Sequence, residues 1–345
     1  MRLVVDGFGK FVGRQGGLVV VREGRRVVKK VKPDEIKQVL ITGKGCISTD
    51  AVELLAANGV DVVFISPSGR IRGRLAHPMV GTARTRREQY AAYLDARGVA
   101  LAREFVMCKL RNQRVVLTNL AKARRESQPE VSERLIEARG EIGECVEMLG
   151  EVEGSRVDEV RDEILGIEGR GSGAYWRALG LVLPEEFGFR GRGTGVDGAR
   201  GARDMVNAML NYGYAVLHAE CLRAVELAGL DPYAGFLHCD RAGRTSLALD
   251  LMEEFRQQVV DRRVIKLVTY GQVKADECEL RNFVCRLGEG ARRRLLNEIL
   301  SGLESQTQHD GRNMSYSSVI LSQARKIAGF VRGERRVYRG FWQGW

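Results

Sequence analysis

Residues 231–256 contain the side chains of this chain whose types and spacing could most clearly do chemistry. His238 follows an apolar triplet, and a polar glycine turn comes directly after it. Asp250, Glu253 and Glu254 then lie three or four residues apart, a spacing that makes carboxylates neighbours on a helix. Like charges in that arrangement repel unless a cation offsets them. An imidazole that the preceding turn delivers toward these carboxylates would make a divalent-metal site.

The helix that must position these carboxylates has a clear apolar side. Ser246 stands where its hydroxyl could accept from a free backbone N–H of the first turn and so cap the helix. The residues expected to face a core recur at helical spacing and are Leu247, Leu251, Met252, Phe255 and Val259. A purely structural interpretation fits the same pattern, with the acidic residues on a solvated face and His238 packed and hydrogen-bonded. The spacing alone leaves both interpretations open.

A second candidate carboxylate, Glu168, lies in a helix predicted over residues 157–178. Apolar residues precede it, and Gly169, Gly171 and Gly173 follow it. Each glycine in a helix costs about 1 kcal/mol relative to alanine, so small residues here favour close approach of another backbone or of a ligand. The structural alternative is a surface glutamate near a fraying helix end.

The composition limits the class of protein. The 345 residues are enough for two domains, and no apolar run is long enough to span a bilayer. The seven cysteines form no Cys-x-x-Cys pair, which argues against a zinc knuckle and a disulfide framework. The chain opens directly on a strand-like pattern, without a secretory signal. We therefore expect a cytoplasmic protein with no membrane partner.

The charge pattern predicts a polyanionic partner. The formal net charge is +11, which favours a polyanionic partner. The planar guanidinium group of arginine can donate two hydrogen bonds to phosphate oxygens. Arginines also cluster, with four near the C-terminus at Arg332, Arg335, Arg336 and Arg339. Those predicted to bind nucleic acid are Arg70, Arg72, Arg74, Arg84, Arg190, Arg192 and Arg203.

The chain divides by pattern into a strand-rich part and a helical part. Residues 1–78 alternate short β-branched runs with Gly, Pro and Asp, interrupted by one helix over residues 49–57. A linker is expected over residues 79–90. Residues 91–345 are expected to form an all-α domain, with helices that include residues 91–119, bent near Gly98.

An ordered set of motifs makes the chain similar to the CRISPR-associated adaptation endonuclease and integrase family, which acquires spacers in most CRISPR systems. The motifs are Gly-Ile-Glu168-Gly, Asn207-Ala-Met-Leu-Asn-Tyr-Gly-Tyr214, Gly235-Phe-Leu-His238 and Leu249-Asp-Leu-Met-Glu-Glu-Phe-Arg256. The N-terminal Leu3-Val-Val-Asp-Gly-Phe-Gly and the late Gln323-Ala-Arg325 also match, so the resemblance spans nearly the whole chain.

This resemblance implies an α+β fold with a small, sandwich-like β-domain and a larger all-α catalytic domain. It also implies that Glu168, His238 and Glu253 are catalytic metal ligands, with Asp250 in a supporting role. One imidazole and two carboxylates suit Mn²⁺ or Mg²⁺. Two departures from the family lie near this site: the loop before Asp204 is richer in Gly and Arg, and glycines replace the usual alanines after Glu168.

The activity implied is metal-assisted insertion of spacer DNA into a repeat array, by attack of a 3′-hydroxyl on a phosphodiester. The implied partners are double-stranded and branched DNA, a second copy of the chain, and a small dimeric adaptation protein. A stand-alone structure-selective nuclease would carry the same metal site. A non-catalytic DNA-binding scaffold would use the carboxylates only to pair with cationic side chains.

Overall fold

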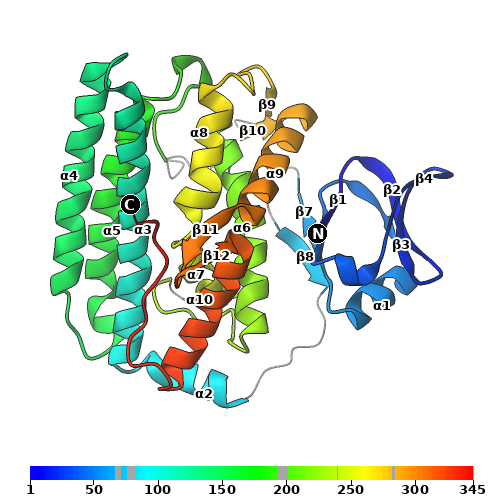
Figure 1. Cartoon of the computed structure of the whole chain (residues 1–345), viewed down its shortest axis with the longest axis horizontal. Helices are drawn as coiled ribbons and strands as arrows, with labels where there is room; N and C mark the ends of the chain where they lie inside the picture. Colours follow the sequence, from blue (N-terminus) through cyan, green and yellow to red (C-terminus); the bar gives the residue numbers. More distant parts are fainter. Residues whose placement is uncertain (67–70, 76–82, 193–200, 239, 282–283, 345) are drawn as a thin grey trace. The chain divides into compact units, whose positions relative to one another are not determined.

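The computed structural model of the chain describes residues 1–66, 71–75, 83–192, 201–238, 240–281 and 284–344 (Figure 1). The chain divides into two compact units, Met1–Val80 and Gly81–Trp345. Each unit has its own set of buried apolar residues. Within the described ranges, no helix is both long enough and apolar enough to cross a membrane.

The first unit contains two four-stranded sheets. Their strands are β1 (Arg2–Val5), β2 (Phe8–Gln15), β3 (Leu18–Glu23), β4 (Arg26–Val31), β5 (Gln38–Ile41), β6 (Lys44–Ile47), β7 (Asp61–Ile65) and β8 (Ile71–Leu75). One sheet has the order β1-β5-β7-β8, in which the first three strands are parallel and β8 is antiparallel to β7. The other has the order β4-β3-β2-β6, and only its β2–β6 pair is parallel.

One hydrophobic cluster joins residues of both sheets. Leu3 and Val5 on β1 and Val19 and Val21 on β3 are all buried in it. The two-residue spacing places each pair on one face of its strand, and this face of each strand contributes to the shared cluster. The predicted strand-rich, sandwich-like N-terminal part of the fold is therefore confirmed.

The predicted helix of the first unit is also present. It is α1 (Thr49–Ala57), and its cap is Ser48, whose Oγ accepts from the backbone N–H of Ala51 at 3.2 Å. The helix ends at Asn58, and Gly59 follows with a φ of 65°. That left-handed conformation is the one for which glycine is favoured after a helix.

The second unit is mostly helical, as predicted. Its helices are α2 (Ala83–Ala92), α3 (Ala96–Arg124), α4 (Pro129–Glu151), α5 (Val157–Gly180), α6 (Met205–Leu227), α7 (Ser246–Met252), α8 (Arg262–Thr269), α9 (Glu289–Glu304) and α10 (Tyr316–Val331). The long helices α3, α4 and α5 lie side by side and pack on one another (Figure 1). Two short hairpins interrupt the expected all-α pattern: β9 (Cys278–Arg281) with β10 (Val284–Leu287), and β11 (Gln306–His309) with β12 (Arg312–Ser315).

The single helix predicted over residues 91–119 is two helices. The break lies before Asp95, which caps α3 by accepting from the N–H of Arg97 at 2.8 Å. Gly98 does not bend the helix. It lets α3 pass close to the end of α2, because a Cβ at this position would lie 2.5 Å from the carbonyl oxygen of Ala92.

Helix α2 occupies much of the segment where we expected a linker. Its Gln89 is buried and is tied to the loop that carries His238. The Gln89 amide donates to the carbonyls of Asp231 and Ala234 at 2.9 and 2.7 Å and accepts from the N–H of Asp231 at 2.8 Å. These residues therefore help to position the candidate site.

The predicted helix after His238 is not continuous. α7 stops at Met252, and a π-helical segment, Arg256–Asp261, precedes α8. Wide turns of this kind are frequent at functional sites. The apolar residues predicted to face the core are all buried: Leu247, Leu251, Met252, Phe255 and Val259.

The predicted cap of α7 is wrong by one residue. Ser246 is the first helical residue and is buried, and Thr245 takes the cap position. Thr245 makes no capping hydrogen bond, because its hydroxyl lies 2.7 Å from Nε2 of His218 instead.

Candidate active site

The turn that carries His238 is built around Asp250. The fully buried carboxylate of Asp250 accepts from the backbone N–H groups of Phe236, Leu237 and His238 at 2.6, 3.0 and 3.0 Å. Gly235 permits this wrapping, because a Cβ there would lie 2.9 Å from Oδ2 of Asp250 and 2.7 Å from a neighbouring side chain of α7. Asp250 thus fixes the backbone of the turn.

Asp250 also orients the imidazole ring of His238. Nδ1 of His238 lies 2.6 Å from Oδ1 of Asp250. An ionised carboxylate only accepts hydrogen bonds, so Nδ1 is the donor and Nε2 carries the lone pair in a neutral ring. Nε2 lies 3.8 Å from Oε1 of Glu253. A carboxylate behind the ring in this way is the usual arrangement for a histidine that binds metal.

Glu253 is a buried carboxylate between two cations. Arg256 Nη2 lies 2.9 Å from its Oε1, and Lys109 Nζ lies 2.9 Å from its Oε2. Burial acts to raise the pKa of Glu253, but Arg256, Lys109 and His238 together lower it to about 2. The side chain is therefore ionised at neutral pH, which a metal ligand requires.

Glu168 joins this cluster from α5. Lys109 Nζ lies 2.5 Å from Oε1 of Glu168, and the same oxygen accepts from the Ser172 hydroxyl at 2.7 Å. Gln113 in turn donates to Ser172 Oγ at 3.2 Å. Burial acts to lower the pKa of Lys109, but Glu253 and Glu168 outweigh it and raise that pKa. Two carboxylates from distant parts of the sequence therefore converge on one cation.

Aromatic side chains support the cationic side of the cluster. The guanidinium groups of Arg256 and Arg192 lie over the ring of Tyr214, 4.7 and 5.5 Å from its centroid. The hydroxyls of Tyr214 and Tyr175 donate to Asp261 at 2.6 and 3.0 Å. Burial raises the pKa of Asp261 to about 6 despite these hydrogen bonds. This network joins the π-helical segment to α5 and α6.

The burial of the acidic residues excludes one part of the purely structural interpretation of the sequence pattern. Asp250 and Glu254 are fully buried, and Glu253 is 3% exposed. A solvated helix face is therefore excluded for all three. His238 is hydrogen-bonded, as the structural interpretation expects, but its Nε2 also faces a carboxylate.

Of the predicted ligands, Glu168 and Glu253 both pair with the ammonium of Lys109, and Nε2 of His238 lies 3.8 Å from the other carboxylate oxygen of Glu253. As the side chains of the described residues stand, no group of three or more His, Cys, Asp or Glu could hold a metal ion. The donor types nevertheless fit Mn²⁺ or Mg²⁺. Oε2 of Glu253 is buried, and the ammonium of Lys109 lies 2.9 Å from it. This oxygen and Nε2 of His238 offer lone pairs to a cation.

The predicted nucleic-acid arginines have different environments. Arg70 lies outside the described residues. Arg74 is half-buried and ion-paired with Asp61 at 2.6 Å. Arg192 donates to side-chain oxygens of Asn207 and Asn211 at 2.8 and 3.1 Å. The exposed members of the set are Arg72, Arg84, Arg190 and Arg203.

Lys109 and Arg256 are the functional residues that sequence reasoning missed. A signal for Lys109 was present, because Lys109, Asn112 and Gln113 lie at i, i+3 and i+4 and so share one face of the helix. All three make contacts at or beside the cluster, since Asn112 donates to the carbonyl of Glu254 at 2.9 Å. Arg256 was visible as the residue one turn after Glu253, but nothing local showed that it is buried.

The model of the family described as CRISPR associated protein Cas1 matches residues 3–300, which is most of the chain. The chain belongs to the Cas1 family. The family resemblance predicted from the motifs is therefore confirmed.

Relatives in the Cas1 family match along their whole length. CRISPR-associated endonuclease Cas1 1 of Archaeoglobus fulgidus is 58% identical over 346 residues, covering 100% of both chains. CRISPR-associated endonuclease Cas1 3 of Thermus thermophilus is 33% identical and covers 96% of this chain and 94% of its own.

Solved structures show the same fold. A casposase bound to integration product has a TM-score of 0.84 and 27% identity, covering 98% of this chain and 92% of its own. A chain of a Cas6-RT-Cas1–Cas2 complex has a TM-score of 0.77 and 20% identity, covering 100% of this chain and 36% of its own. A Cas1 protein from Thermotoga maritima has a TM-score of 0.76 and 18% identity, covering 99% of this chain and 100% of its own.

Proposed function

We propose that this chain is a metal-dependent DNA endonuclease and integrase that inserts spacer DNA into a CRISPR repeat array. The observation that carries the proposal is the convergence of Glu168 and Glu253 on one cation, with Nε2 of His238 beside them. Two findings support it further. The full-length relative from Archaeoglobus fulgidus is named an endonuclease, and the similar casposase is bound to an integration product.

Glu168, Glu253 and His238 would hold Mn²⁺ or Mg²⁺. The bound metal would polarise a phosphodiester and stabilise the charge that develops on its oxygens. Asp250 holds the ring of His238 in place by accepting from Nδ1, so that in the neutral ring the lone pair of Nε2 is directed at Glu253. Lys109 holds the two carboxylates together across α3, α5 and the turn after α7.

The remaining cations prepare the site for a phosphate. Arg256 neutralises Glu253 from one side and is itself held over Tyr214. Arg192 lies over the same ring and over Trp176, at 5.8 Å from its centroid. A cluster of two carboxylates would otherwise repel a phosphodiester, so these guanidinium groups favour its approach.

The attacking group separates integration from nicking. In strand transfer a DNA 3′-hydroxyl attacks the phosphodiester, whereas in hydrolysis water attacks it. The same three side chains serve both reactions, so their variants cannot separate them. We expect the chain, with Mn²⁺, to join a 3′-hydroxyl DNA to a repeat-containing duplex and to fail with a dideoxy-ended strand. Equal product yields with the 3′-hydroxyl strand and with the dideoxy-ended strand would favour the stand-alone nuclease.

The proposed partners are DNA, a second copy of the chain and a small dimeric adaptation protein. Cas1 occurs with Cas2 in the named complex that this fold resembles. The first unit carries exposed apolar side chains, since Phe8 is 84% exposed on β2, and Val27 and Val28 are 37% and 44% exposed on β4. β4 is also an edge strand, whose unpaired backbone groups can pair with another chain.

Light scattering tests the proposed dimer. A truncated chain that starts at Ala83, the first residue of α2, should be monomeric, while the whole chain should be a dimer. A dimer of the truncated chain would place the interface in the second unit.

A further inference from the structure

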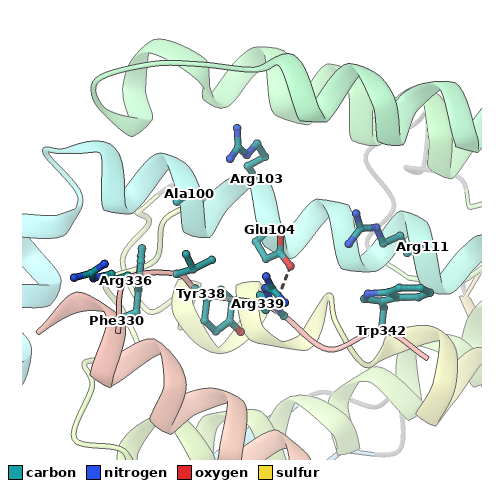
Figure 2. Close-up of a pocket in the computed structure, with 11 residues that line it drawn as sticks. Ala100, Arg103, Glu104, Arg111, Phe330, Arg336, Tyr338, Arg339 and Trp342 are labelled. Carbon is teal, nitrogen blue, oxygen red and sulfur yellow. Dashed lines mark hydrogen bonds between the residues drawn. The ribbon is translucent and has the colours of Figure 1, made fainter. Parts of the chain in front are cut away.

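A pocket with a basic lining lies where the C-terminal strap (residues 334–344) passes along α3. Its volume is about 520 Å³. Arg103, Glu104 and Arg111 line it from α3, and Arg336, Arg339 and Trp342 line it from the strap (Figure 2). The lining therefore has four arginines and one glutamate, and it lies wholly within the second unit.

This pocket is separate from the candidate active site. Ala100, Glu104 and Arg111 are spaced so that they share one face of α3. At about 100° per residue, Lys109 points roughly to the opposite side of the helix. The ligand of this pocket therefore does not reach the metal position of the same chain across α3.

The arginines of the pocket lack acidic partners. In the part of the chain that the structure describes, Arg111, Arg336 and Arg339 form no ion pair with a carboxylate, and Arg103 donates to the carbonyl of Val152 at 3.0 Å. Glu104 is already used, since it accepts from the N–H of Gly340 at 3.0 Å. The pocket thus keeps an excess of positive charge for an anion.

An aromatic ring completes the lining. Trp342 is 38% exposed, and the guanidinium of Arg111 lies 5.4 Å from the centroid of its ring (Figure 2). Arginines beside an accessible aromatic ring are the combination that binds single nucleic-acid strands, with phosphates on the cations and bases on the ring.

The strap is held in place before any ligand binds. Tyr338 and Phe341 of the strap are buried, and both bond to Glu254, Tyr338 through its hydroxyl and Phe341 through its backbone N–H. Gly340 lets the strap run close to α3, because a Cβ there would lie 2.6 Å from Sγ of Cys108. The strap backbone is therefore fixed beside α3, while the side chains of Arg336 and Arg339 are exposed to a ligand.

We propose that this pocket binds a nucleotide unit, with its phosphate at Arg336 and Arg339 and its base against Trp342. The unit could be a free nucleotide or the end of a single DNA strand, because both present the same phosphate and base. The site goes beyond the proposed metal chemistry and shares no lining residue with it.

Fluorescence anisotropy of a labelled, 5′-phosphorylated oligothymidylate tests the proposal. The whole chain is used in EDTA, so the result does not depend on the metal site. Arg336→Gln and Arg339→Gln should each weaken binding roughly fivefold and lower its salt dependence. Arg335→Gln is the matched control: it removes the same charge from the same segment outside the pocket, and its affinity should stay near that of the unaltered chain.

Trp342→Leu tests the stacking half of the proposal. It should weaken oligonucleotide binding roughly tenfold, the scale of one lost base stack. Because this substitution removes the fluorophore proposed to stack on the base, the quenching of tryptophan fluorescence by the added nucleotide or oligonucleotide should also be lost. Quenching by dTMP alone identifies a free-nucleotide site, and quenching only by the oligonucleotide identifies a strand site.

Two results would overturn the proposal. The first is unchanged oligonucleotide affinity in Arg336→Gln, Arg339→Gln and Trp342→Leu. The second is competition by a poly-glutamate peptide as effective as that by oligonucleotide, which would show a surface for acidic protein segments. Neither result bears on DNA nicking with Mn²⁺, so failure here is distinguishable from failure of the proposed function.

Discussion

Glu253 and Glu254 are adjacent in the sequence and both are buried, yet they face two regions of opposite character. Glu253 faces the cations Lys109 and Arg256. Glu254 faces neutral donors of the strap and of α10, since it accepts from Phe341 N–H at 2.7 Å and from Gln323 Nε2 at 3.0 Å.

The two environments move the two pKa values in opposite directions. Burial raises the pKa of Glu254 to about 7, although hydrogen bonds from Tyr338, Phe341 and Gln323 act to lower it. The pKa of Glu253 is lowered to about 2 despite burial, because full charges lie beside it. Burial alone therefore does not decide the ionisation of a carboxylate. The charge of its partners does, and only the ionised glutamate suits a metal.

The largest expected effect separates the two glutamates by activity. Glu253→Ala should reduce Mn²⁺-dependent DNA nicking by more than about 100-fold, because losing a ligand should cost more than losing the group that orients one. Glu254→Gln should leave the nicking rate close to that of the unaltered chain. Gel assays of a nicked plasmid measure both. Full activity of Glu253→Ala would show that the cluster is structural, as a non-catalytic scaffold requires.

A smaller effect is expected when the residue that orients His238 is changed. Asp250→Asn cannot accept all of the hydrogen bonds that the carboxylate accepts, and it perturbs the ring orientation of His238. Mn²⁺ affinity measured by calorimetry should fall by about 10- to 100-fold. Glu298→Gln, which removes a carboxylate that pairs with Lys266 at 3.0 Å, is the control and should keep the affinity. Equal affinities of Asp250→Asn and the control would remove Asp250 from the site.

Of the two adjacent glutamates, Glu254 and not Glu253 should contribute to the pH dependence of stability near neutral pH. The raised pKa of Glu254 means that its contribution to stability is present below 4.5 and is lost as the pH rises through about 7. Glu253, with its lowered pKa, contributes stability above 4.5 and loses it only as the pH falls through about 2.

Urea denaturation in EDTA over a pH series measures this contrast. Between about pH 5 and pH 8, the free energy of unfolding of the unaltered chain relative to Glu254→Gln should fall by up to about 3 kcal/mol. A constant difference across this range would show that Glu254 stays ionised in the folded chain.

The smallest effect concerns the strap. Tyr338→Phe removes the hydroxyl that donates to Oε1 of Glu254 and should lower the free energy of unfolding by about 1–2 kcal/mol. DNA nicking should be unchanged, because Glu253 keeps its own partners. The urea midpoint and the nicking rate are measured on the same preparation. A loss of nicking in a folded Tyr338→Phe chain would show that the two regions are coupled through residues 253–254.

The sequence by itself determined the local features of this protein. Short β-branched runs bounded by Gly, Pro and Asp specified the strand-rich first unit, and helical spacing specified the buried side of the segment from Leu247 to Val259. The order of the motifs specified the family. These features depend on residues near one another in the chain, so their physical causes are visible in a short window.

Only the tertiary structure decided what each charged side chain does. Glu253 and Glu254 look alike in sequence, and the end of α7 before the π-helical segment allows them to face different partners. Those partners, Lys109 and Tyr338, come from α3 and from the strap, far from residues 253–254 in the chain. Ionisation depends on such distant charges and on burial, and neither has a local signature in the sequence.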